Sequence, residues 1–404
     1  MFLKSGIANG FENCEMHMNI IVSTDGNIPS KRAHSISVMK MAQGFHQLGM
    51  SVSVVSLLSL PIMKNWLSIR NIYDFYGVTS EIEIKLLPVW NRDFFSKSIT
   101  AKEFHHRAVL FIKKRMPEVV YSRSYLIPYY AVKSNLPVII ETHTTLYEHP
   151  DVKKLYEIAA HSSFLGLVTI SEKIKREHIR RGVPEDKIIV LEDGVDLDLF
   201  NIEDDRVKWR KHLRLPENKR IVMYCGHLYD EKGIEHILLT ARGLEVNRDV
   251  IFVIVGGYAN DGDRWKRYCS EKNISNVLFT GFVNNSLVPK YLKSADVLIM
   301  PYKGDMHYKM MDIDTTSPLK MFEYMASKRP IVSTDIPAIS KVLKHNHSAL
   351  LAEPDDIGKL SIHVLDLLRD AERGEMLATN ALNDVVRFEW KERCRNIIAR
   401  FLKR

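Results

Sequence analysis

The chain has no hydrophobic run that approaches the roughly 20 apolar residues needed to cross a lipid bilayer. Its first segment, MFLKSGIANGFENCEMH at residues 1–17, contains acidic residues and no continuous apolar core. It therefore does not predict a secretory signal peptide. We expect this segment to be either a disordered N-terminal extension or the product of an upstream start codon, ahead of a first strand near Met18.

Cysteine is scarce as well, and the four cysteines (Cys14, Cys225, Cys269 and Cys394) form no C-x-x-C pair. This favours reduced thiols in the cytosol over a disulfide framework or a zinc site. The sequence also lacks an RNA-binding aromatic signature, zinc-finger spacing and a long basic tail, so we predict no nucleic-acid partner. The net charge of +8 is moderate and favours an anionic ligand, such as a nucleotide or a phospholipid surface.

What the chain does contain is a regular alternation of short apolar runs with longer amphipathic stretches. Most runs are continuous and β-branched, which is typical of parallel strands buried on both faces and joined by helices. At 404 residues, two domains are expected. We predict an α/β fold of two doubly wound, Rossmann-like domains facing a cleft. The predicted strands cover 18–23, 52–58, 83–89, 119–123, 137–143, 166–171, 188–192, 220–226, 250–257, 277–283, 296–302, 330–335 and 348–352.

The apolar rhythm breaks at NIEDDRVK, residues 201–208, which predicts the domain boundary. The predicted units are an N-terminal domain at 18–200, a C-terminal domain at 201–385 and a final helix at 386–404. Residues 375–404 are helical by pattern, and the sequence leaves open whether they pack on the second domain or cross back to the first. Ligands of open α/β sheets bind at the carboxyl ends of the strands, so we expect the site in the cleft.

The segment SPLKMFEYMA, residues 317–326, lies between two predicted strands. We predict a helix with Ser317 as the N-cap and Pro318 at the first helical position. Lys320 then falls in the first turn, where the helix dipole disfavours a cation by about 0.3–1 kcal/mol. A phosphate bound at the helix end would explain this lysine, and Glu323 would reach a second part of the same ligand. The alternative is an ordinary surface helix.

Three predicted strands of the second half end in glycine, at Gly226, Gly256 and Gly281. Gly226 is followed by His227 and, after a turn, by Lys232, although neither a P-loop nor a G-x-G-x-x-G spacing is present. A solvated loop lysine is the alternative for Lys232. In a doubly wound sheet these strand ends and the helix at Ser317 would converge on one crevice, which favours a phosphate-bearing ligand.

The first half contributes three further candidates. Gly26 lies in the loop TDGNIPSKR after the first strand, and His143 ends the predicted strand 137–143, so both point toward the cleft unless His143 is purely structural. The segment EDGVD at 192–196 is more simply a turn. The basic amphipathic segment Thr100–Arg115 would rest on an anionic membrane, or else present a solvated face with its apolar stripe in the core.

Together these segments resemble a GT-B glycosyltransferase of the retaining family 4, which includes many bacterial capsule, lipopolysaccharide and glycolipid transferases. The resemblance extends from Met18 to the region of Trp390. Its most specific part is SPLKMFEYMA followed by KRPIVSTDIPAI. Next come YCGHLYDEKG, NVLFTGFVNNSLVPKYLKSADVLIMPY and EDGVDLDLF, and IPSKRAHSISVMKMAQGFHQLGMSV resembles the family's acceptor-side opening.

The resemblance implies an acceptor-binding N-terminal domain and a donor-binding C-terminal domain. Glu323 would bind the donor ribose as the second glutamate of the family's E-x7-E element, while Lys232 would neutralise the diphosphate. The remaining implied contacts are backbone amides of Leu319 and Lys320 to the diphosphate, Gly281, Phe282 and Val283 around the nucleobase, His143 near the transferred sugar, and Gly26 toward the diphosphate from the acceptor domain.

Two positions depart from the family pattern. Thr315 replaces the first acid of the element, and His227 stands where many relatives have arginine, which leaves Lys232 as the one permanent cation. Asp312 and Asp314 have D-x-D spelling but are expected in a loop. No metal or cofactor is predicted, because helix-end amides and Lys232 can stabilise the leaving diphosphate.

The implied activity is transfer, with retention, of a hexose or N-acetylhexosamine from a UDP- or GDP-sugar to a glycan or a lipid-linked acceptor. This would take place in the cytoplasm or at the inner face of the plasma membrane, in synthesis of cell-surface polysaccharide or glycolipid. Two alternatives share the fold: a nucleotide-sugar 2-epimerase, and a catalytically silent GT-B protein that only binds nucleotide or a second transferase.

Overall fold

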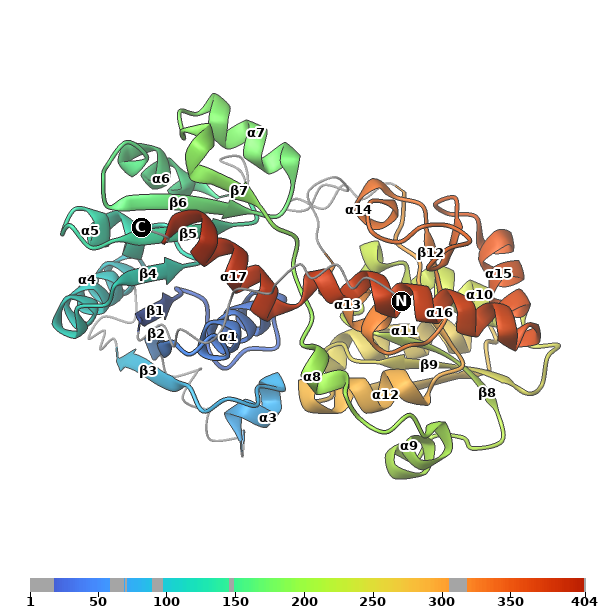
Figure 1. Cartoon of the computed structure of the whole chain (residues 1–404). Coiled ribbons are helices and arrows are strands. Elements are labelled where there is room, and N and C mark those ends of the chain that lie inside the picture. The colour runs from blue at the N-terminus through green and yellow to red at the C-terminus, as the bar shows by residue number, and fades with distance from the viewer. Residues whose placement is uncertain are drawn as a thin grey trace, which may run out of the picture.

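A computed structural model describes residues 18–58, 69, 71–88, 97–144, 149–304 and 318–402. The predictions for residues 1–17, for Asp312 and Asp314, for Thr315 and for Ser317 lie outside these ranges. Figure 1 shows two α/β domains side by side, with the chain returning from the second to the first at its C-terminal end. In the described part of the chain, no helix combines the length and the apolar character needed to cross a membrane.

The N-terminal domain is built on a seven-stranded parallel sheet with the strand order β3-β2-β1-β4-β5-β6-β7. The order reverses at β1, which is the mark of a doubly wound sheet. The strands are β1 Asn19–Ser23, β2 Ser51–Leu58, β3 Glu83–Pro88, β4 Val119–Ser122, β5 Val138–Thr142, β6 Phe164–Thr169 and β7 Ile188–Val190.

The C-terminal domain has a six-stranded parallel sheet with the order β10-β9-β8-β11-β12-β13. Here the order reverses at β8. The strands are β8 Arg220–Cys225, β9 Val250–Val255, β10 Val277–Gly281, β11 Val297–Met300, β12 Ile331–Thr334 and β13 Leu350–Ala352.

Each predicted strand corresponds to an observed one, and the predicted α/β, GT-B-like architecture is confirmed. Apolar side chains cover both faces of each sheet, which explains why the runs are continuous rather than alternating. Several strands end one or two residues before the predicted end. As a result His143, Gly226 and Gly256 lie just beyond β5, β8 and β9, at the edge that faces the cleft.

Helices connect the strands and pack on the sheets. The α-helices are α1 Ala33–His46, α3 Ile72–Tyr76, α4 Lys97–Arg115, α5 Leu126–Val132, α6 Lys153–Ile158, α7 Glu172–Arg180, α8 Leu197–Phe200, α9 Arg206–Leu213, α10 Ile234–Gly243, α11 Ala259–Glu271, α12 Val288–Ser294, α13 Leu319–Ala326, α14 Pro337–Ser340, α15 Ile357–Arg369, α16 Ala371–Val385 and α17 Trp390–Phe401. Short 3₁₀ turns are η1 Pro150–Val152, η2 Glu185–Lys187, η3 Asp230–Lys232, η4 Asn285–Leu287 and η5 Val386–Phe388.

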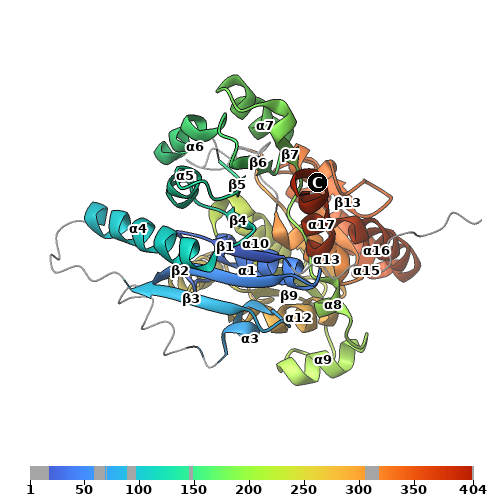
Figure 2. The ribbon, with the colours of Figure 1, turned by 60° about the vertical axis from the view of Figure 1, so that its left-hand side comes forward.

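The predicted helical stretch 375–404 is divided by η5 into α16, which packs on α13, and α17, which crosses back to α1 of the first domain (Figures 1 and 2). Gly44 of α1 allows this close packing. A Cβ there would lie 2.8 Å from Cys394 Sγ and 2.9 Å from the carbonyl oxygen of Trp390. The alternative that the sequence left open is thus decided in favour of the crossing.

A second interdomain contact lies between α3 and η4. Asn284 Nδ2 donates to Asp74 Oδ2 at 2.7 Å, and Asn285 Nδ2 donates to the carbonyl of Phe75 at 3.2 Å. The ring of Phe75 also packs against Phe282, with centroids 5.5 Å apart. The two domains are therefore in contact at α3 and η4 as well as along α17. The cysteines within the described ranges, Cys225, Cys269 and Cys394, are buried free thiols.

Candidate active site

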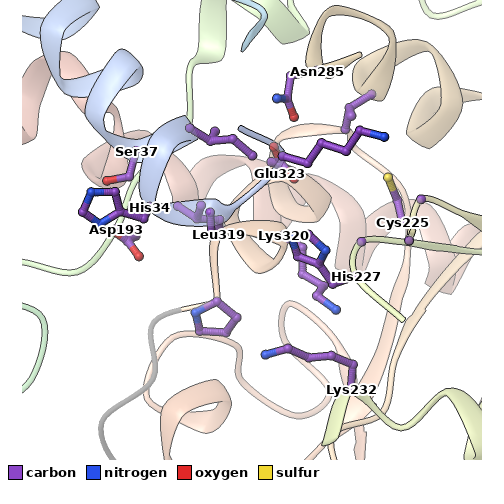
Figure 3. A pocket seen from close by; sticks show the side chains of 18 of the residues that line it. His34, Ser37, Asp193, Cys225, His227, Lys232, Asn285, Leu319, Lys320 and Glu323 are labelled. Atoms are coloured by element: carbon purple, nitrogen blue, oxygen red, sulfur yellow. The ribbon is translucent and has the colours of Figure 1, made fainter. Parts of the chain in front are cut away.

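The cleft holds a pocket to which both domains contribute (Figure 3). Most of its residues lie near a strand end or in the first turns of a helix, as expected for a doubly wound fold. The lining includes Lys31, His34, Arg123, His143 and Asp193 from the N-terminal side, and Gly226, His227, Lys232, Gly256, Phe282, Val283, Pro318, Leu319, Lys320 and Glu323 from the C-terminal side.

Two predicted site residues do not line this pocket. Gly281 supports it from behind, since its carbonyl oxygen accepts a hydrogen bond from the amide of Gly256 at 2.9 Å. Gly26 lines a neighbouring pocket, which His143 also lines. The ring of His34 stands against Gly26, and a Cβ on this glycine would lie 2.6 Å from it. The structure therefore does not bring Gly26 to the pocket of Lys232 and Glu323.

Helix α13 enters the pocket with its N-terminus. It begins at Leu319 with Pro318 as the N-cap residue, so the prediction that Pro318 is the first helical residue is wrong by one position. The alternative of a surface helix is also wrong, because most of α13 is buried, including Lys320. The amine of Lys320 donates to the hydroxyl of Tyr224 at 2.5 Å, so the side chain points along the pocket wall.

Lys232 enters the same space from η3 (Figure 3). The next residue, Gly233, has φ +69°, and a Cβ there would lie 1.5 Å from the carbonyl oxygen of Pro301. Only glycine fits this turn, which fixes the direction of Lys232. Lys232 is half-buried and lines the pocket, which argues against a freely solvated loop lysine, and burial lowers its pKa to about 8.

The two lysines change the charge inventory of the pocket. The sequence predicts Lys232 as the one permanent cation at the diphosphate and a backbone amide from Lys320, whereas the side chains of both lysines line one pocket. Burial, with a further contribution from Lys232, lowers the pKa of Lys320 well below its usual value. Two amines held in a buried pocket are both favourably charged only when an anion binds between them.

His227 adds no charge to this pair. Burial, reinforced by Lys320 and Lys232, lowers the pKa of His227 to about 4, so its ring is neutral at pH 7. The ring stacks on both Tyr229 and Tyr258, with centroid distances of 5.1 and 5.6 Å. His227 is thus a neutral lining group at the position where the family pattern often has arginine.

Glu323 follows Lys320 along α13 and lines the same pocket. Burial raises the pKa of Glu323 to about 7, against the opposing influence of Lys40 and Lys320. Its carboxylate can accept hydrogen bonds from hydroxyl groups of a ligand. Thr315, which replaces the paired acid of the family pattern, lies outside the described residues.

His143 faces these groups from the N-terminal domain. Its Nε2 lies 2.7 Å from Glu141 Oε1 and 3.8 Å from Asp193 Oδ1. The three residues offer ligand atoms within 4.8 Å of one another, a spacing that a metal ion could bridge. However, Arg393 lies 2.9 Å from Glu141 Oε2 and Arg123 lies 3.7 Å from Oε1. These residues fit an ion-pair network better than a metal site.

Sequence reasoning missed several lining residues. Lys31 lies in the loop TDGNIPSKR that the sequence analysis singled out, and its amine lies 4.0 Å from the ring centre of Phe282 in the other domain. Arg123 and Asp193 were missed because only the pairing of distant strands brings them to His143. The available signal was their position beyond strand ends, Arg123 directly after β4 and Asp193 three residues after β7.

Comparison with known proteins agrees with this geometry. Residues 35–199 match the family described as Glycosyltransferase Family 4, and residues 205–384 match the family described as Glycosyl transferases group 1. The two matches cover most of the chain. This chain is a family 4 glycosyltransferase. The predicted enzyme class is thereby confirmed.

Individual relatives are distant. The glycosyltransferase is 24% identical over 230 residues to an uncharacterized glycosyltransferase of Methanocaldococcus jannaschii, a match that covers 55% of this chain and 56% of that protein. It is 25% identical over 170 residues to the processive diacylglycerol alpha-glucosyltransferase of Acholeplasma laidlawii, which covers 42% and 47% of the two chains. The chain thus spans about half the length of these relatives.

Solved structures show the fold more completely. HepE of Anabaena, solved in complex with UDP and glucose, superposes with a TM-score of 0.71 at 15% identity. The match covers 96% of this glycosyltransferase and 99% of HepE. At this level of identity the likeness shows the fold alone, and it confirms the GT-B architecture predicted from the sequence.

Proposed function

We propose that this glycosyltransferase transfers a hexose or N-acetylhexosamine, with retention of configuration, from a UDP- or GDP-sugar to a glycan or a lipid-linked acceptor. One observation carries the proposal: Lys232, Lys320 and Glu323 from one domain and His143 from the other line a single pocket. Two amines suit a diphosphate, and a carboxylate beside them suits ribose hydroxyls.

The proposed donor pose follows from these positions. The diphosphate lies between Lys232 and Lys320, at the N-terminus of α13, where the backbone amides of Leu319 and Lys320 and the helix dipole favour negative charge. Phe282 and Val283 border the nucleobase, and Glu323 binds the ribose. These groups stabilise the leaving diphosphate electrostatically, so the transfer is proposed to require no metal.

His143 is the proposed contact to the transferred sugar. It approaches from the acceptor side, and the donor binds on the opposite wall of the cleft. We propose that an acceptor hydroxyl attacks the anomeric carbon from the same side on which the diphosphate leaves, so that the configuration is retained. The departing phosphate then receives the proton of the hydroxyl, and no strong protein base is needed. The UDP and glucose bound in the HepE structure, and the glucosyltransferase activity for which the Acholeplasma relative is named, are compatible with a hexose donor.

The acceptor and the location follow from weaker observations. We propose action in the cytoplasm, with reversible contact to the inner face of the plasma membrane through α4. The apolar stripe of Thr100–Arg115 is buried in the core, and the outward face carries Leu110, Lys113, Lys114 and Met116. In both views α4 lies on the side of the N-terminal domain away from the C-terminal domain (Figures 1 and 2). A lipid-linked acceptor would suit this placement.

Replacement of Lys232 or Glu323 by alanine tests the proposal. We expect both variants to fold and to lose transfer, while Lys303→Ala retains it, because Lys303 pairs with Glu235 outside the pocket lining. A thermal-shift screen of nucleotides and nucleotide sugars would identify the donor, since a ligand at about 100 times its Kd stabilises by roughly 2.7 kcal/mol. Full activity of both site variants would refute the assignment.

The two alternatives have distinct outcomes in the same assays. A 2-epimerase would convert a nucleotide sugar to an isomer without any acceptor. A silent binding partner would bind UDP in calorimetry but neither transfer nor slowly hydrolyse any donor.

A further inference from the structure

His143 is oriented by a buried glutamate. Glu141 is a residue of β5 with a fully buried side chain, and its Oε1 lies 2.7 Å from His143 Nε2. Burial alone would raise the pKa of Glu141, but Arg393 and the hydrogen bond to His143 outweigh it and lower the pKa to about 2. An ionised carboxylate can only accept, so Nε2 of His143 carries the proton of this hydrogen bond and the imidazole is held in one orientation.

The partner of Glu141 comes from the opposite end of the chain. Arg393 belongs to the crossover helix α17, and its Nη1 donates to Glu141 Oε2 at 2.9 Å. The rest of the guanidinium donates to the carbonyls of Glu192, at 2.9 Å, and of Leu191, at 3.3 Å. This buried fork can adopt one orientation only, because each branch has a fixed acceptor.

We propose that Arg393 is a positioning residue for His143, acting through Glu141, so that docking of α17 on the first domain sets the orientation of the imidazole. This inference rests on the proposed function, in which His143 contacts the transferred sugar. It assigns to the C-terminal helix, which follows the donor-binding domain in sequence, a role in the geometry of the acceptor side.

The remaining contacts of the network do not replace Arg393. Arg123 lies 3.7 Å from Glu141 Oε1, which is beyond hydrogen-bonding distance. The same oxygen already has His143 Nε2 as its hydrogen-bond partner. Tyr121 donates its hydroxyl to Oε2, but it carries no charge. Without Arg393, Oε2 would lose its charged donor, and the carboxylate would be free to rotate away from His143.

Three variants test the proposal in the full-length protein. Arg393→Met is expected to lower kcat by about tenfold or more with the donor KM changed less than about threefold, because misplacement of a reacting group affects the chemical step. Arg393→Lys is expected to restore only part of kcat, since it keeps a charge beside Glu141 but loses the fork to the two carbonyls. Arg395→Met, on the exposed side of the same helix, is the matched control and should match the wild type.

A double-variant cycle separates positioning from general destabilisation. If Arg393 acts through His143, adding Arg393→Met to His143→Ala causes no further loss of kcat. An additional tenfold loss in this background would overturn the proposal.

The imidazole can also be observed without any substrate. In spectra of ¹⁵N-histidine-labelled protein, the signal of His143, assigned by its loss in His143→Ala, should show one fixed tautomer in the wild type and a mixture in Arg393→Met. An unchanged tautomer together with an unchanged kcat would overturn the proposal.

If Arg393→Met does not fold, Glu141→Gln replaces it in both measurements, and the same results are expected. The glutamine amide can present either its NH₂ group or its oxygen to His143, so it no longer fixes the ring. A wild-type protein that transfers no sugar would refute the proposed function but would leave this spectroscopic readout intact.

Discussion

The amine of Lys320 lies 2.5 Å from the hydroxyl of Tyr224 and 4.1 Å from the centre of its ring. The ring of Tyr302 lies 5.3 Å away on another side. The first turn of α13 therefore holds a buried amine between two aromatic rings, in a pocket that also contains Lys232. Such an arrangement costs stability when the pocket lacks an anion, and it suggests that Lys320 is kept for binding.

Replacement of Lys320 by methionine should separate binding from stability. We expect the affinity for UDP or GDP to fall by about tenfold or more, since a charged hydrogen bond contributes about 1.5–3 kcal/mol. The free energy of unfolding should be unchanged or higher, because a desolvated amine is replaced by an apolar chain of similar length. Calorimetry and urea denaturation would measure the two quantities. Lys303→Met is the control, and an equal loss of affinity in it would contradict the prediction.

Nucleotide binding should weaken as the pH rises through about 8. Below the pKa of about 8, Lys232 is already protonated in the free protein, so this lysine takes up no proton on binding. Above it, the lysine must regain a proton to pair with the diphosphate, so affinity falls by up to about tenfold per pH unit.

Calorimetry at pH 7, 8 and 9 would check this, with two buffers of different ionisation enthalpy at pH 9 to detect proton uptake. Ionisation of the nucleotide does not explain a fall in affinity above pH 8, because the last pKa of a phosphate monoester is about 6 and the terminal phosphate is already fully ionised there. The trend should be lost in Lys232→Met. An affinity that is independent of pH in the wild type would refute the assigned role.

The packing of α17 on α1 predicts a strong effect of one methyl group. Gly44→Ala places a Cβ 2.8 Å from Cys394 Sγ and 2.9 Å from the Trp390 carbonyl oxygen. We expect the free energy of unfolding to fall by about 1–3 kcal/mol, because an overpacked contact with backbone atoms is not easily relieved. The midpoint of urea denaturation would show it.

The helical glycine Gly262 is the matched control. A Cβ on Gly262 meets nothing within 4 Å, so Gly262→Ala should be neutral or stabilising by up to about 1 kcal/mol. Equal midpoints of urea denaturation for Gly44→Ala and Gly262→Ala would contradict the prediction, because the close contact at Gly44 would then not affect stability.

Membrane contact through α4 should be reversible and sensitive to salt. We expect the protein to sediment with anionic vesicles at low ionic strength and to be released when screening shortens the Debye length to about 3 Å at 1 M salt. Lys113→Glu/Lys114→Glu should abolish binding. Lys266→Glu/Arg267→Glu on α11 lowers the net charge equally and should retain it. No sedimentation of the wild type at low salt would remove this proposal.

Much of the fold could be predicted from local sequence. A buried parallel strand needs an apolar, β-branched run, and each of these runs is visible in the chain without knowledge of its neighbours. The glycine residues at or just beyond the ends of β8, β9 and β10 and the segment of α13 are equally local. For this reason the sequence alone predicts that Lys232, Lys320 and Glu323 share one crevice.

The prediction failed where the outcome depends on which side chain stands next to another. Gly26 was expected at the diphosphate, but the ring of His34 lies against it. The burial of Lys320 was missed because its contact with Tyr224 joins residues 96 positions apart. No periodicity within α13 contains that information.

By itself, the sequence determined the two α/β domains, the family and most of the residues that line the C-terminal side of the pocket, because strand burial, glycine turns and helix starts are encoded within a few consecutive residues. Only the tertiary structure decided that α17 returns to the first domain and that Arg393 meets Glu141 across 252 positions. Contacts of this kind depend on the packing of complementary surfaces, here the bare backbone at Gly44 against Trp390 and Cys394, and that complementarity exists only once both domains have folded.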